Sequence, residues 1–67
     1  MTIDVKKLKL AMARACLDVK ELGAAADIGN ATLTRILHGN ESVRFSTAGK
    51  LARALGVDVA EIIMEEG

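Results

Sequence analysis

The sequence predicts an all-α domain built from five short helices. Apolar residues recur at helical spacing in successive segments, and no proline interrupts them. The β-branched residues are scattered and do not alternate with polar ones, so no strand is expected. The length of 67 residues suits one domain, and we expect residues 1–67 to form a single compact unit. Phe45 is the one aromatic residue, so the core must be aliphatic.

The first helix is expected to run from Val5 to about Ala15. Asp4 is a suitable N-cap, and Ile3 can pack against Leu8 as a hydrophobic staple. Cys16 follows the helix. A single cysteine cannot form an internal disulfide, and with one histidine it cannot build a metal site, so we expect it to be a small buried residue.

Two short helices separated by a tight break are predicted between residues 17 and 39. Asp18 and Glu21 have the spacing of a capping box at the start of the first helix. The break is Asp27-Ile28-Gly29, where aspartate tolerates the left-handed conformation and glycine is acceptable as an N-cap. The second helix spans residues 30–38 and ends at Gly39. Its predicted inner face consists of Leu33, Ile36 and Leu37, and that of the first helix consists of Leu22, Ala25 and Ala26.

The two remaining helices follow a loop without periodicity. Ser46 or Thr47 is the expected N-cap of the fourth helix, which should stop at Gly56. A second capping box, Asp58 with Glu61, should open a short fifth helix. The residues expected to face inward from these two helices are Ala48, Leu51, Ala52, Leu55, Val59, Ile62 and Ile63.

Two short helices joined by a tight turn, the second with a polar and basic outer face, describe a helix-turn-helix over about residues 18–38. The segment resembles the DNA-reading unit of the Cro/lambda-repressor family, the Xre-type helix-turn-helix. The resemblance covers about Lys7 to Ile63. The residues that carry it are Leu17 and Leu22, Ile28 after the turn, Arg35, Ile36 and Gly39, and the L-A-x-A-L-G-V run of residues 51–57.

The resemblance implies that the second helix of this unit reads base edges in the major groove of double-stranded DNA. Asn30, Ala31 and Arg35 match the base-reading positions of the family, and Thr32 and Thr34 flank them. The chemistry agrees, because asparagine can pair with adenine, arginine with guanine, and an alanine methyl with the thymine methyl. Two alternatives remain open: Asn30 can instead be an N-cap, and Arg35 a surface charge or a phosphate contact.

Phosphate contacts are expected at the two rims of this surface. The helix beginning at Val19 presents its positive end, so the N–H groups of Val19 and Lys20 can bind a phosphate. Relatives often carry glutamine at the position of Val19, and valine lacks that polar side chain. On the other rim we expect His38, Asn40 and Arg44, the last at a phosphate or in the minor groove. Arg44 can also be a simple loop charge.

The charge distribution fits an anionic partner, although the net charge is zero. The last ten residues carry four acidic and no basic side chains, so residues 1–57 have nine basic side chains against five acidic ones.

We expect no catalytic site, cofactor, metal or small-molecule ligand, because there is no paired-carboxylate or Cys–His arrangement and no glycine-rich phosphate loop. No apolar run reaches membrane-spanning length and no signal peptide is recognisable, so a cytoplasmic protein is expected.

The sequence therefore predicts a DNA-binding transcription regulator, and specifically a repressor that binds a palindromic operator as a homodimer. The expected dimer contacts are Met64, Ile63 and Phe45. One alternative is an antitoxin that binds a toxin protein through its acidic tail and Met64 and represses its own operon. Another is a protein-interaction module that has lost DNA binding.

Met12 and Leu37 stand where relatives often carry an Arg–Glu bridge, and we expect them to contact each other.

Overall fold

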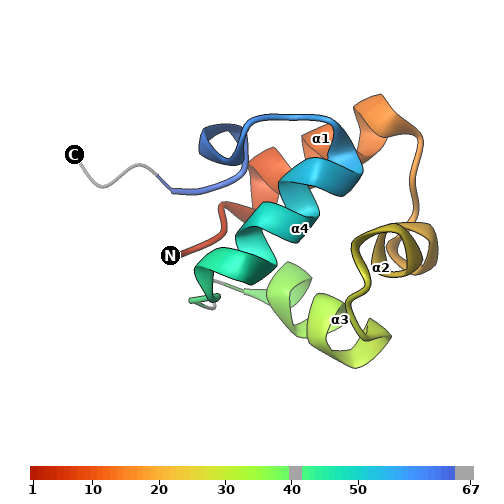
Figure 1. Ribbon diagram of the computed structural model, residues 1–67, viewed down its shortest axis with the longest axis horizontal. Coiled ribbons are helices and arrows are strands. Elements are labelled where there is room, and N and C mark those ends of the chain that lie inside the picture. Colours follow the sequence, from red (N-terminus) through yellow and green to blue (C-terminus); the bar gives the residue numbers. More distant parts are fainter. Residues whose placement is uncertain (40–41, 65–67) are drawn as a thin grey trace.

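The computed structural model describes residues 1–39 and 42–64, which form four α-helices and one short turn (Figure 1). In chain order the elements are α1 (Val5–Ala15), α2 (Val19–Ala26), α3 (Asn30–His38), α4 (Phe45–Leu55) and the 3₁₀ turn η1 (Val59–Glu61). The predicted all-α class is confirmed. The predicted fifth helix is wrong, because only the three-residue η1 forms there. Within the described ranges, no helix is long and apolar enough to cross a membrane.

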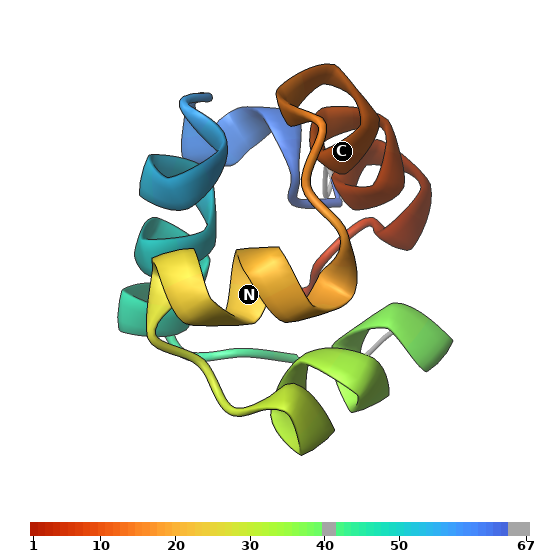
Figure 2. The ribbon, with the colours of Figure 1, turned by 90° about the vertical axis from the view of Figure 1, so that its right-hand side faces the viewer.

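The core is aliphatic, as the composition requires. Helix α4 packs against α2 and η1, while α1 packs against α3, α4 and η1 (Figure 2). Ala25 is exposed, contrary to expectation, because α2 turns Leu22, Gly23 and Ala26 inward instead. The buried apolar side chains are Ile3, Leu8, Ala11, Met12, Leu22, Ala26, Leu33, Ile36, Ala48, Leu51, Ala52, Leu55 and Ile62.

The first two helices begin where local chemistry predicts. The backbone N–H of Lys7 donates to Asp4 Oδ1 over 3.2 Å, which makes Asp4 the N-cap of α1. At α2 the capping box is complete, since the N–H of Glu21 donates to the Asp18 carboxylate and Glu21 Oε1 accepts from the Asp18 N–H. Each bond satisfies a donor that the first helical turn leaves without an intrahelical partner.

Helix α4 begins earlier than predicted. Its N-cap is Arg44, in an extended conformation and with no side-chain capping bond, so neither Ser46 nor Thr47 caps it. The reason lies in the preceding backbone, where the N–H of Val43 donates to the Met1 carbonyl over 2.6 Å. This bond fixes the backbone just before Arg44, and the helix can start directly after that residue. The residue preferences at helix N-caps are local, so they take no account of this long-range hydrogen bond.

Cys16 is exposed, which corrects the prediction that it is buried. It forms the C-cap of α1 with φ of 56°, a left-handed conformation that is uncommon for residues other than glycine. Its N–H donates to the Ala13 carbonyl, and the N–H of Leu17 donates to the Met12 carbonyl. The left-handed turn directs the chain so that Leu17, not Cys16, packs against the core.

The N-terminal residues form a short extended segment between two distant parts of the chain. Thr2 pairs with Ser42 and Ile3 pairs with Ile63, both antiparallel. On the C-terminal side the N–H of Asp4 donates to the Ile62 carbonyl, and the N–H of Met64 donates to the Thr2 carbonyl. These bonds use backbone groups that a longer helix after residue 58 would need for itself. The second capping box is present at Asp58 and Glu61, but only one 3₁₀ turn follows it.

Gly23 permits the close approach of α2 to the turn that follows it. A Cβ atom at this position would lie 3.0 Å from the Ile28 carbonyl oxygen and 3.7 Å from a methyl group of Leu33. The Ile28 backbone is itself fixed, because its N–H donates to the Gly23 carbonyl over 2.9 Å. Packing therefore explains a glycine in the interior of a helix, where it costs about 1 kcal/mol relative to alanine.

We predict that Gly23→Ala lowers the free energy of unfolding by about 1 kcal/mol, despite the better helix propensity of alanine. The matched control is Gly49→Ala in α4, where the added Cβ meets no atom within 4 Å. That control should stabilise the protein by about 0.5–1 kcal/mol. Urea unfolding of both variants measures the difference. Stabilisation by both substitutions would show that the turn can move aside.

The expected contact between Met12 and Leu37 stays a prediction. Met12 is buried, Leu37 packs against the same core, and their helices α1 and α3 contact each other. We predict a coupling free energy of at least about 0.5 kcal/mol in a double-mutant cycle of Met12→Ala and Leu37→Ala. Strictly additive effects on the unfolding midpoint would mean that the two side chains do not touch.

Candidate nucleic-acid interface

The turn between α2 and α3 holds the two helices in a fixed orientation. Asp27 ends α2 in the left-handed conformation, with φ of 56°, as the sequence predicts for the break. Gly29 is the N-cap of α3 in an extended conformation, and its carbonyl accepts the N–H of Leu33 over 3.0 Å. The buried side chains Leu33 and Ile36 then press α3 onto the core. The helix can therefore present only one face to solvent.

That face contains every residue predicted to read bases. The side chains of this set are all exposed, and they alternate with the buried positions of α3 at helical spacing. The structure thus gathers them on one exposed helix face, and an α-helix fits the major groove of duplex DNA. The five residues are Asn30, Ala31, Thr32, Thr34 and Arg35.

The alternative role of Asn30 as an N-cap is excluded, because Gly29 occupies that position and α3 begins at Asn30. The Asn30 side chain lies at the open end of the helix and is exposed. Thr34 differs from the rest of the set, since its hydroxyl donates to the Asn30 carbonyl over 2.8 Å. Its Oγ1 can still accept a hydrogen bond, and its methyl group is available for apolar contact.

One hollow is lined both by a residue predicted to contact phosphate and by a residue predicted to contact a base. It has a volume of about 380 Å³ and lies between α2 and the start of α3. Lys20, predicted to contact phosphate, and Asn30, predicted to contact a base, both line it. The other lining residues are Gly23, Ala24, Asp27, Ile28 and Gly29. Lys20 therefore lies on the same side of the unit as the N-terminal end of α3.

The start of α2 offers backbone donors but also negative charge. The capping box uses the N–H groups of Asp18 and Glu21, while those of Val19 and Lys20 remain at the positive end of the helix. The Val19 side chain is half-buried against the core, so this residue offers a phosphate only its backbone N–H group. The carboxylates of Asp18 and Glu21 would oppose an incoming phosphate, so at this rim the expected attraction rests mainly on the Lys20 side chain.

The opposite rim contains the end of α3 and the start of α4. His38 is exposed in the last turn of α3, and Arg44 is exposed at the N-cap of α4. Asn40 lies outside the described residues. The positive end of α4 also lies at this rim, and it is not apparent from the sequence, because Ser46 and Thr47 both suit an N-cap. With no side-chain cap there, the first-turn N–H groups of α4 are further candidate phosphate donors.

Comparison with known proteins identifies a relationship over most of the chain. Residues 7–64 match the family model of the Cro/C1-type HTH DNA-binding domain. No curated protein and no solved structure matches the chain. The matched region contains all the predicted base-reading residues and the helix-turn-helix formed by α2 and α3.

Proposed function

The chain belongs to the Cro/C1-type HTH DNA-binding family and is a DNA-binding transcription regulator, and from this premise we propose that it is a repressor that binds a palindromic operator as a homodimer. The exposed face of α3 is the observation that carries the proposal. Asn30 and Arg35 offer the amide and guanidinium groups that pair with adenine and guanine, and the Ala31 methyl suits thymine. Repression follows from occupying a promoter, which requires no catalytic group.

A homodimer is needed because one short helix contacts too few base pairs for useful discrimination. Two-fold symmetry would place two copies of α3 in successive major grooves, roughly 34 Å apart, on a palindromic site. The dimer therefore needs a self-complementary surface away from α3.

Three exposed apolar side chains support a dimer contact near the N-terminal extended segment. Met1, Phe45 and Met64 are 38, 78 and 43 % exposed, respectively. The hydrogen bonds of this segment place the three residues in one region of the fold, since the Val43 N–H, two residues before Phe45, donates to the Met1 carbonyl and the Met64 N–H donates to the Thr2 carbonyl. We call Met1, Phe45 and Met64 the terminal apolar patch. Ile63 contributes less, because it is half-buried against the core.

An antitoxin is the second candidate function. The exposed apolar side chains outside α3, which include Met64, form a surface that a toxin protein could bind. A toxin gene beside this one, together with a stable complex on co-expression, would favour this function. A regulator without such a neighbour, which represses from the selected DNA site alone, would favour the first proposal.

The central experiment selects bound sequences from random duplex DNA. We predict a palindromic consensus and, for Arg35→Ala, a loss of about 1–3 kcal/mol in binding with relaxed preference at one base position. The matched control is Arg53→Ala, which removes the same charge in the last turn of α4, at the end of that helix away from α3 (Figure 1). An unchanged consensus for Arg35→Ala would assign Arg35 to the phosphate backbone.

Arg44→Ala should behave differently from Arg35→Ala. We predict that it weakens binding to all sequences alike, or affects AT-rich flanks, and reduces the salt slope of log K by about one. Titrations at several salt concentrations, with Arg53→Ala as the control again, measure this slope. A slope identical to that of the unmodified chain would make Arg44 a loop charge without a role in binding.

Dimerisation is tested by Met64→Glu. We predict about tenfold weaker self-association in sedimentation and the loss of cooperative binding to a full site, with half-site binding unchanged. Ala13→Glu, at an exposed position of α1, controls for the added charge. If Met64→Glu keeps both self-association and full-site cooperativity, the interface lies elsewhere and the terminal apolar patch is not used.

A further inference from the structure

A second surface, on the outer side of α1, is not used by the proposed DNA contacts. Leu10 lies in the middle of this helix with 59 % of its surface exposed. Beside it a groove of about 360 Å³ separates α1 from the segment that contains η1. Its lining residues are Lys7, Leu10, Ala11, Arg14, Val57, Ala60 and Glu61. We call this the α1–η1 groove.

The α1–η1 groove lies at the end of the molecule away from α3. In both ribbon views α1 and η1 lie at the top and α3 at the bottom (Figures 1 and 2). A duplex that receives α3 in its major groove therefore leaves this groove accessible. Its apolar centre is also poorly suited to phosphates, which favour polar and charged donors.

Positive charge surrounds the apolar centre. Helix α1 contains four basic residues and no acidic one, although the chain as a whole is neutral. Lys6, Lys7 and Arg14 lie three or four residues from Leu10, which places them beside it on the helix surface. A partner with carboxylates around a large apolar side chain would match this arrangement in both charge and polarity.

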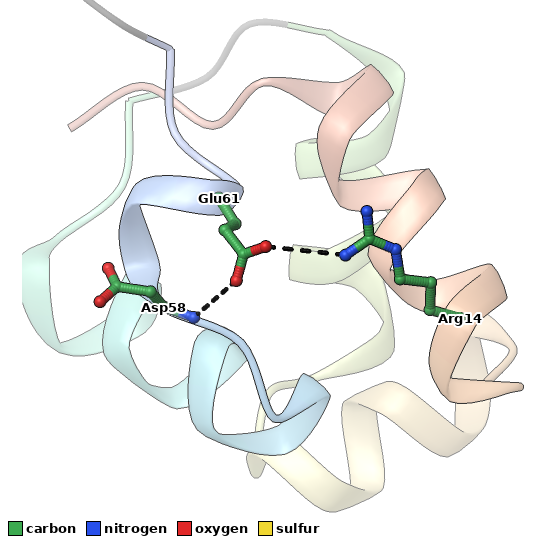
Figure 3. Close-up of polar contacts among 3 residues, drawn as sticks. All are labelled: Arg14, Asp58 and Glu61. Atoms are coloured by element: carbon green, nitrogen blue, oxygen red, sulfur yellow. Dashed lines mark hydrogen bonds and ion pairs between the residues drawn. The ribbon is translucent and has the colours of Figure 1, made fainter.

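Among the described residues, Glu61 is the one acidic side chain that lines the groove, and it already has two contacts. Glu61 Oε1 lies 3.6 Å from a guanidinium nitrogen of Arg14, while Oε2 accepts the N–H of Asp58 over 3.1 Å (Figure 3). The Arg14 and Glu61 side chains are 72 and 50 % exposed, so solvent screens this ion pair and it contributes little. Arg14 can therefore turn to a carboxylate from outside, while the capping box keeps Glu61 in place.

We propose that the α1–η1 groove binds an acidic amphipathic helix of another protein, with Leu10 as the apolar contact and Lys7 and Arg14 as the charged ones. A helix that lays one apolar face into a groove is a common mode of peptide recognition. A second copy of this chain is disfavoured as the occupant. Two-fold pairing through α1 would bring Lys7 and Arg14 against the same cations of the other copy.

The test is a selection from a library of displayed random peptides on the full chain, followed by binding measurements on the enriched peptides. We expect enrichment of glutamate or aspartate around large apolar residues spaced three or four apart. These peptides should bind Leu10→Glu at least about tenfold more weakly than the unmodified chain. Ala13→Glu adds the same charge to the same helix outside the groove lining, and it should change peptide binding by less than about twofold.

Leu10→Glu should fold normally, because the new carboxylate lies four residues before Arg14 and at the same spacing from Lys6. Its binding to the selected DNA site should also be unchanged, which separates this proposal from the DNA-binding one. Enriched peptides that bind Leu10→Glu as well as the unmodified chain would overturn the proposal, as would a library without acidic enrichment. Loss of self-association in Leu10→Glu would instead assign the groove to a second copy and also overturn it.

Discussion

The approach of α2 to the Ile28 carbonyl is the constraint on which the position of the exposed face of α3 depends. With hydrogen as its only side chain, Gly23 lets the turn pass close to α2, and the same turn determines where α3 begins. The left-handed Asp27 and the extended Gly29 then complete a connection of three residues. Any displacement of this turn would rotate α3 and move Asn30 and Arg35 together, because both are placed by one rigid helix. The positions of polar side chains on α3 are thus set by packing on its opposite face.

The N-terminal extended segment has a comparable role at the other end of the molecule. Its backbone bonds to residue 43 on one side and to residues 62 and 64 on the other. Arg44 follows directly after the first of these pairings and Met64 belongs to the second. The segment therefore couples the proposed DNA-contacting rim to the terminal apolar patch. Movement of either region would have to break hydrogen bonds that Met1, Thr2 or Asp4 makes with it.

Sequence reasoning succeeds here where structure is determined by neighbours along the chain. The caps at Asp4 and Asp18, the left-handed Asp27 and the exposed face of α3 all follow from residues within one or two helical turns. It fails where distant segments compete for the same backbone groups. The start of α4 depends on Met1, and the truncation of the fifth helix depends on Thr2 and Asp4. Neither pairing has a local pattern, because two or three extended residues are too short to show alternation.

The candidate site illustrates the same division. The exposure of the five α3 residues was predictable from helical periodicity. The uncapped N-terminus of α4 was not, because Ser46 and Thr47 are both plausible capping residues. The half-buried Val19 side chain and the complete capping box at α2 shift the expected electrostatic attraction from that helix end toward Lys20 and toward the other rim. The zero net charge of the chain can then be explained by where its cations lie. Lys20, Arg35 and Arg44 can serve the anionic duplex, while the cations of α1 surround an apolar groove on the far side. A neutral net charge is therefore compatible with two oppositely placed basic surfaces, each matched to a different kind of acidic partner.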